Sequence, residues 1–103
     1  MKPVVIISTY PDQKSITKIA NMLVKRQIVA CVNVIKIRSV YSWKKKTVNT
    51  SEYLAIFKTT RQNITKLKNE IRKTHPYEVP EIAEITISSL SKSYLKWLID
   101  STN

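Results

Sequence analysis

Few residues in this chain of 103 could bind a metal ion. It contains one histidine, His75, and one cysteine, Cys31. A neutral imidazole suits copper and zinc, but one histidine and one cysteine cannot complete a tetrahedral site. Any such site would need carboxylates or neighbouring chains, and the acids near His75 in the sequence are Glu78 and Glu81. We therefore expect weak divalent-metal binding centred on His75, with Cys31, Glu78 and Glu81 as the other candidate ligands.

Both metal-ligand candidates also have a structural interpretation. His75 precedes Pro76, where a helix ends, and its ring could hydrogen bond to nearby carbonyl groups. Cys31 lies in an apolar stretch, where a cysteine acts as a small hydrophobic side chain. A Ser-His-Asp arrangement would need the single histidine, and no nucleophile motif accompanies it. Nothing favours a Cys31–His75 dyad either, so we expect no enzymatic activity.

Aromatic and charged residues form a second candidate site. Tyr41 and Trp43 share one face of a predicted strand, and aromatic side chains are typical of both ligand clefts and subunit interfaces. Glu52 and Lys58 lie on the returning strand, where each could pair with another side chain or contact an anionic ligand; pairing is the favoured reading. The residues expected in a cleft or interface are Tyr41, Trp43, Glu52, Lys58 and Tyr77.

The composition excludes several classes of protein. The chain has no glycine, so the glycine-rich loops that bind phosphates are absent. Its 18 basic and 7 acidic residues give a net charge of +11, which by itself predicts only nonspecific attraction to polyanions. A single cysteine suggests a reducing compartment, and neither a secretory signal nor an apolar run of membrane-spanning length is visible. We expect a cytoplasmic protein that does not bind membranes.

Hydrophobic periodicity predicts one α+β domain over residues 1–103. Apolar residues at spacings of three and four indicate helices, and β-branched runs indicate strands. The expected elements are a strand at 2–9 buried on both faces, a helix at 12–27, strands at 28–43 and 47–59 around a turn at 44–46, a helix at 61–74 capped by Thr60, a strand at 81–87 and a short final helix capped by Ser91. This order is the ferredoxin-like pattern, a four-stranded antiparallel sheet with two helices on one face.

The second face of this sheet is also expected to be apolar. Residues 4–7 and 53–57 are apolar at both strand parities, although the two helices cover only one face. A monomer would expose the other face, and large exposed apolar surfaces mark interfaces. We therefore expect a homo-oligomer, with the long 28–59 hairpin as the arm that contacts the neighbouring chain.

Six sequence blocks carry a family resemblance. They are STYPD at 8–12, ACVN at 30–33, YSW at 41–43, KTT at 58–60, HPYEVPEI at 75–82 and YLKW at 94–97. In these blocks, and end to end, the chain resembles the CutA family of divalent-cation tolerance proteins. The resemblance implies a ferredoxin-like homotrimer, usually cytoplasmic, that is related in architecture to PII signalling proteins. It also implies Cu²⁺ or another divalent metal as the ligand, and no organic cofactor.

The chain departs from the family pattern at three positions. Copper binding in bacterial members is associated with a cysteine in the first strand and two adjacent histidines, and these positions match Ser8, Thr74 and His75. Only His75 is retained. Lys45 stands where the hairpin turn normally carries glycine, and a lysine at positive φ costs about 1 kcal/mol. We therefore expect a turn of another shape.

Three functions remain open from the sequence. The first is divalent-metal homeostasis by a homotrimer. The second is a PII-like sensor that binds a small ligand in clefts between subunits near Tyr41, Trp43 and Lys58. The third is a nucleic-acid-binding module, because RNA-recognition modules share this element order. Their glycine-containing signature is impossible here, so we expect nucleic acid to bind only nonspecifically.

Overall fold

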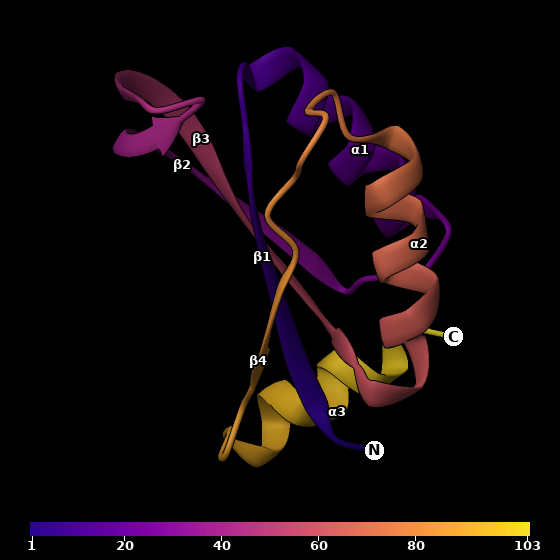
Figure 1. Ribbon diagram of the computed structural model, residues 1–103. Coiled ribbons are helices and arrows are strands. Elements are labelled where there is room, and N and C mark those ends of the chain that lie inside the picture. The colour runs from indigo at the N-terminus through magenta and orange to yellow at the C-terminus, as the bar shows by residue number, and fades with distance from the viewer.

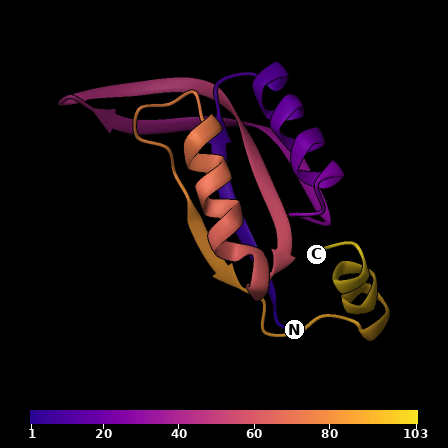
Figure 2. The ribbon, with the colours of Figure 1, turned by 90° about the vertical axis from the view of Figure 1, so that its right-hand side faces the viewer.

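The computed structural model describes residues 1–103, which form four strands, three α-helices and one short 3₁₀ helix. In chain order the elements are β1 (Pro3–Tyr10), α1 (Gln13–Lys25), β2 (Cys31–Trp43), β3 (Lys46–Thr60), the short 3₁₀ helix η1 (Arg61–Asn63), α2 (Ile64–Thr74), β4 (Ala83–Thr86) and α3 (Lys92–Asp100). The strands form one antiparallel sheet in the order β2-β3-β1-β4. Figure 1 shows β2 and β3 extending beyond the other strands as a long hairpin, and Figure 2 shows α1 and α2 on the same face of the sheet. The predicted α+β fold with a four-stranded antiparallel sheet is confirmed.

The hydrophobic core lies between this sheet and helices α1 and α2. On β1, Val4, Ile6 and Tyr10 have no exposed surface, whereas Val5 and Ile7 between them are half-buried. The helices add Ile16, Ile19, Leu23, Ile64, Leu67 and Ile71. Burying one such aliphatic side chain contributes about 1.5–3 kcal/mol. The prediction that the first strand is buried on both faces is wrong for the single chain, because helices cover only one face.

The helix starts follow from their first hydrogen bonds. Asp12 has an extended backbone, and its carboxylate accepts the backbone N–H of Ser15 at 2.8 Å, which is the geometry of an N-cap. Ser91 precedes α3 as predicted, but its side chain forms no capping hydrogen bond. None of the helices has the length and apolar character needed to cross a membrane.

The second helix begins later than predicted. Thr60 was expected to cap it, but the chain first makes the 3₁₀ turn Arg61–Asn63, and the Thr60 side chain forms no capping hydrogen bond. The buried Asn63 amide instead donates to the backbone carbonyl of Ile28 at 3.3 Å. This contact with the segment before β2 holds the turn in place, so α2 starts at Ile64.

Two strands are also shorter than predicted. The N–H of Ile28 donates to the carbonyl of Leu23 at the end of α1, so the chain enters the core before it joins the sheet. Strand β2 therefore begins at Cys31. Strand β4 is limited to Ala83–Thr86 because it pairs only with the first half of β1, Val4–Ile7.

The hairpin of β2 and β3 closes with a two-residue turn. Trp43 pairs with Lys46, and the intervening Lys44 and Lys45 have φ angles of 50° and 65°. Two successive positive φ angles are typical of a type I′ turn, which matches the right-handed twist of the strands. The prediction that Lys45 would avoid positive φ is therefore wrong. The twist of the long hairpin imposes this geometry even without glycine.

Apolar side chains cover much of the sheet face that lacks helices. Strand register places on this face Val5, Ile7, Ile35, Ile37, Leu54, Ile56, Ala83 and Ile85, which we call the open face. All of them are partly or largely exposed, with exposed fractions of 51% for Ile35 and 48% for Ile85.

Replacing the strained turn should stabilise the protein. In the double variant Lys44→Asn/Lys45→Gly, both residues accept positive φ, so we expect the free energy of unfolding to rise by about 1–2 kcal/mol. Urea denaturation at one fixed protein concentration measures this change. The matched control Lys44→Ala/Lys45→Ala removes the same charges but keeps the backbone strain. If the alanine pair stabilised the protein as much as Asn-Gly, charge repulsion rather than backbone geometry would be the cause.

Candidate functional site

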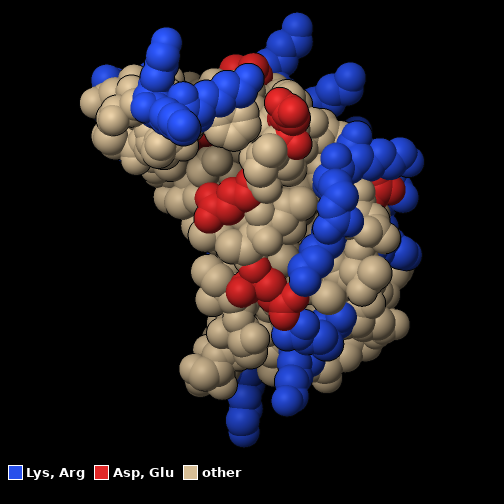
Figure 3. Space-filling model, in the orientation of Figure 1, with Lys and Arg blue, Asp and Glu red and all other residues tan.

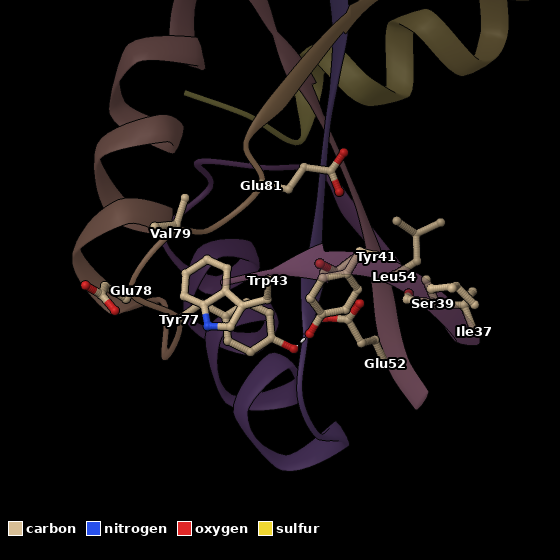
Figure 4. Close-up of a pocket in the computed structure, with 12 residues that line it drawn as sticks. Ile37, Ser39, Tyr41, Trp43, Glu52, Leu54, Tyr77, Glu78, Val79 and Glu81 are labelled. Carbon is tan, nitrogen blue, oxygen red and sulfur yellow. Dashed lines mark hydrogen bonds between the residues drawn. The ribbon is translucent and has the colours of Figure 1, made fainter. Parts of the chain in front are cut away.

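A cavity of about 690 Å³ opens between the hairpin and the segment that follows α2. This volume lies within the usual range for small-molecule pockets. Its lining includes Tyr41, Trp43, Glu52, Tyr77, Glu78 and Glu81, and we call it the cleft. Figure 4 shows the three aromatic rings grouped together, with the Glu52 side chain beside them. Figure 3 shows acidic side chains on the hollowed side of the molecule, with lysine and arginine side chains projecting around it.

Glu52 is a buried carboxylate in this cleft. It is only 5% exposed, and its Oε2 accepts a hydrogen bond from the Tyr77 hydroxyl at 2.5 Å. Burial, followed by this hydrogen bond to the carboxylate, raises the pKa of Tyr77 well above its ordinary value. Tyr77 therefore remains a hydrogen-bond donor to Glu52 at physiological pH.

His75 anchors the segment that carries Tyr77. Its Nδ1 accepts the backbone N–H of Tyr77 at 3.1 Å, and its Nε2 lies 2.9 Å from the carbonyl oxygen of Thr9. This pattern requires the neutral tautomer with the proton on Nε2, which donates to Thr9. The Ser8 hydroxyl lies 3.1 Å from the same nitrogen, and the ring of Tyr10 stacks on the imidazole at 4.2 Å between centroids. These contacts agree with the structural interpretation of His75, in which the ring at the end of a helix hydrogen bonds to nearby backbone groups.

The four predicted metal ligands do not come together within one chain. Both ring nitrogens of His75 are already hydrogen bonded. Cys31 lies at the start of β2, opposite Lys58, and its thiol donates to Asn33 Oδ1 at 3.7 Å. No group of three or more His, Cys, Asp or Glu side chains is arranged to hold a metal ion. The residues of a single chain therefore do not fit the copper site that the family resemblance implies.

The two other family ligand positions also have structural contacts. The Thr74 hydroxyl donates to the backbone carbonyl of Glu70 at 2.7 Å, within α2. Ser8, on β1, is fully buried against the His75 ring. Neither residue type replaces the thiolate or imidazole that a copper site would need.

Of the five residues predicted for a cleft or an interface, four line the cleft, namely Tyr41, Trp43, Glu52 and Tyr77. Lys58 does not. Although Lys58 has the strand parity of Glu52, it lies near the other end of β3, and its Nζ is 5.6 Å from the ring centroid of Tyr94 in α3.

Glu78 and Glu81, which were predicted as metal ligands, lie at the cleft together with residues that the sequence did not indicate. Both glutamates line the cleft and are exposed. Thr9 and Leu54 also line it and were not predicted. Strand parity could have indicated Leu54, because it shares a strand face with Glu52.

The fold and the cleft define a small α+β protein with a ligand-sized cavity beside an uncovered sheet face. The family model described as CutA1 divalent ion tolerance protein matches residues 4–101. The chain is 37% identical over 98 residues to the divalent-cation tolerance protein CutA of Thermotoga maritima, covering 95% of this chain and 97% of that protein. The chain therefore belongs to the CutA1 divalent ion tolerance family.

Solved structures of relatives have the same fold. The crystal structure of CutA1 from Pyrococcus horikoshii superposes with a TM-score of 0.94 at 36% identity, covering 97% of this chain and 98% of that one. The periplasmic divalent cation tolerance protein CutA from Archaeoglobus fulgidus also gives a TM-score of 0.94, at 28% identity, covering 98% and 99% of the two chains.

Protonation of His75 should destabilise the fold. Burial lowers the pKa of His75 below the ordinary imidazole value of 6.5. As the pH falls through that value the unfolded chain takes up a proton before the folded chain does, so folding stability falls and then levels off below the folded-state pKa. We expect the wild type to lose more stability than His75→Gln between pH 7.5 and pH 5.5 in urea denaturation. Equal losses in the two proteins would contradict this assignment, because the variant has no other histidine.

Proposed function

We propose that this chain is one subunit of a homotrimer that binds divalent cations weakly through Glu78 and Glu81 rather than through His75. One observation carries the proposal. Both ring nitrogens of His75 are hydrogen bonded within the chain, whereas Glu78 and Glu81 are exposed, line the cleft and form no ion pair. The names of the relatives refer to divalent-cation tolerance and supply the class of ligand.

Carboxylates determine which metals such a site would accept. Carboxylate oxygens suit Mg²⁺, Ca²⁺ and Mn²⁺, whereas imidazole and thiolate favour copper and zinc. The carboxylates of Glu78 and Glu81 lie apart from each other in Figure 4, so each would fill only part of the coordination shell of its own hard cation. Water molecules or carboxylates of neighbouring chains would complete the shell, and binding would therefore be weak. We therefore propose a preference for harder cations in place of the copper preference that the family resemblance implies.

The open face supports the homotrimer. Its apolar side chains would remain in contact with water in a monomer, and surfaces of this kind usually mark an interface. The count of three subunits rests on the resemblance to the family. The strand order β2-β3-β1-β4 supports a ferredoxin-like fold. The cytoplasmic location remains a prediction, since one similar protein is described as periplasmic.

Sensing of a small ligand is the second candidate function. The observation that favours it is the cleft, because a cavity of about 690 Å³ is far larger than a metal ion requires. The family is named for tolerance to divalent ions and not for a reaction, so a binding function agrees with that name.

A Mn²⁺ titration tests the metal proposal. By isothermal titration calorimetry, Glu78→Gln/Glu81→Gln should weaken Mn²⁺ binding at least about tenfold, because both proposed ligands lose their charge. His75→Gln should leave the affinity within about twofold, because the glutamine amide keeps an N–H donor for the Thr9 carbonyl and is not a ligand in the proposed site. The matched control Glu70→Gln/Asp100→Asn removes two carboxylates elsewhere and should also leave it unchanged. Loss of affinity in His75→Gln alone would contradict the proposal and return the metal to the histidine.

Native mass spectrometry tests the oligomer. We expect three copies for the wild type and a shift towards monomer for Ile35→Lys, because a charge on the open face would have to be buried in the interface. The control Val24→Lys adds the same charge to a residue that is 42% exposed on α1, on the helix-covered side, and should remain a trimer. Circular dichroism verifies that both variants fold. A wild type that is monomeric, or an Ile35→Lys variant that remains trimeric, would contradict the role of this face.

A further inference from the structure

Glu52 lacks the cationic partner that a buried carboxylate usually has. It is 5% exposed, and the only hydrogen bond to its carboxylate is the one from Tyr77, which reaches one of the two oxygens. The chain has 18 lysine and arginine residues, and none of them forms an ion pair with Glu52. Buried charges are normally paired, because removing a charge from water is costly. The free oxygen of Glu52 therefore indicates a place for a cation that comes from outside this chain.

Aromatic rings surround the same position. Figure 4 shows Tyr41, Trp43 and Tyr77 next to the Glu52 carboxylate. Tyr41 and Trp43 are each 41% exposed, so their ring faces are accessible from the cleft. Aromatic faces attract ammonium and guanidinium groups, and the Nζ of Lys44 already lies 5.8 Å from the ring centroid of Trp43. The surroundings of Glu52 suit a cation that also has apolar surface.

A bare metal ion fits this position poorly. The carboxylates of Glu52, Glu78 and Glu81 lie apart from one another in Figure 4, and no three such groups could hold one ion. More than half of the residues that line the cleft are hydrophobic. An alkylammonium or alkylguanidinium ion has a diffuse or accessible charge, donates hydrogen bonds to a carboxylate and carries apolar carbon atoms that pack on aromatic rings.

We infer that the cleft binds an organic cation, whose ammonium or guanidinium group donates to Glu52 and lies among the rings of Tyr41, Trp43 and Tyr77. This inference concerns the buried carboxylate and does not depend on divalent-metal binding at Glu78 and Glu81. The same cationic group has two sources. One is a free small molecule, and the other is a lysine or arginine side chain of a neighbouring copy of the chain.

The test uses n-butylguanidinium chloride as the probe and 1-pentanol as its uncharged counterpart. The chain has two tryptophans, so the indole N–H signals in a ¹H–¹⁵N spectrum report on the cleft through Trp43 and on a distant helix through Trp97. We expect n-butylguanidinium to shift the Trp43 signal in a saturable way and to leave Trp97 unchanged. Pentanol should shift neither signal.

Variants then connect the binding to the proposed contacts. Glu52→Gln keeps the shape of the side chain but loses its charge, and should weaken binding at least about tenfold, as expected for a lost charge-assisted hydrogen bond. Tyr41→Leu replaces a largely exposed ring, keeps the reporter and should weaken binding about threefold even if Glu52→Gln folds poorly. The control Asp100→Asn removes a carboxylate on α3, outside the cleft, and should bind within about twofold of the wild type. Equal affinity of the probe for wild type, Glu52→Gln and Tyr41→Leu would overturn the inference.

The oligomer distinguishes the two sources of the cation. Binding to the wild-type protein supports a free small molecule as the ligand. Binding only to the monomeric Ile35→Lys variant supports a side chain of a neighbouring copy, which would occupy the cleft in the oligomer. If the probe binds neither protein, the inference is wrong. That result would not affect the proposed metal binding at Glu78 and Glu81, which the Mn²⁺ titration tests separately.

Discussion

The imidazole of His75 joins strand β1 to the segment after α2 that lines one side of the cleft. Its Nε2–H donates to the carbonyl of Thr9, which is 66 residues away in the sequence, and its Nδ1 accepts the N–H of Tyr77, which is 2 residues away. One neutral ring therefore connects two distant parts of the chain. The position of Tyr77 in turn allows its hydroxyl to reach Glu52 on β3. The cleft therefore depends on a series of side-chain hydrogen bonds that starts at one uncharged histidine.

In this arrangement the histidine has a structural role, and the acidic side chains of the cleft are the groups available to a ligand. The histidine that a copper site would require is used to position a loop, and the positions of the other two family ligands hold serine and threonine. Negative charge gathers in the cleft instead, because three of the seven acidic residues of a chain with net charge +11 line it. Such a site attracts cations by Coulombic and cation–π interactions, while the basic surface around it repels them.

Periodicity in the sequence predicted the α+β fold, the long hairpin and the shared face of Tyr41 and Trp43, because these features depend on local spacing. Contacts between distant residues explain what it missed. The start of α2 depends on the Asn63 amide, and the role of His75 depends on Thr9. Lys58 shares the parity of Glu52, but six residues along a strand span about 20 Å, so parity alone could not place both in one cleft.

The protonation and hydrogen bonding of His75 test this account most directly. The chain has one histidine, so a long-range ¹H–¹⁵N spectrum of the imidazole reports on it without ambiguity. At pH 7.5 we expect one neutral tautomer, protonated at Nε2 and unprotonated at Nδ1, with ¹⁵N shifts that do not change when Cu²⁺ or Zn²⁺ is added at concentrations equal to that of the protein. A mixture of tautomers, or metal-dependent shifts or broadening confined to the imidazole nitrogens, would contradict it.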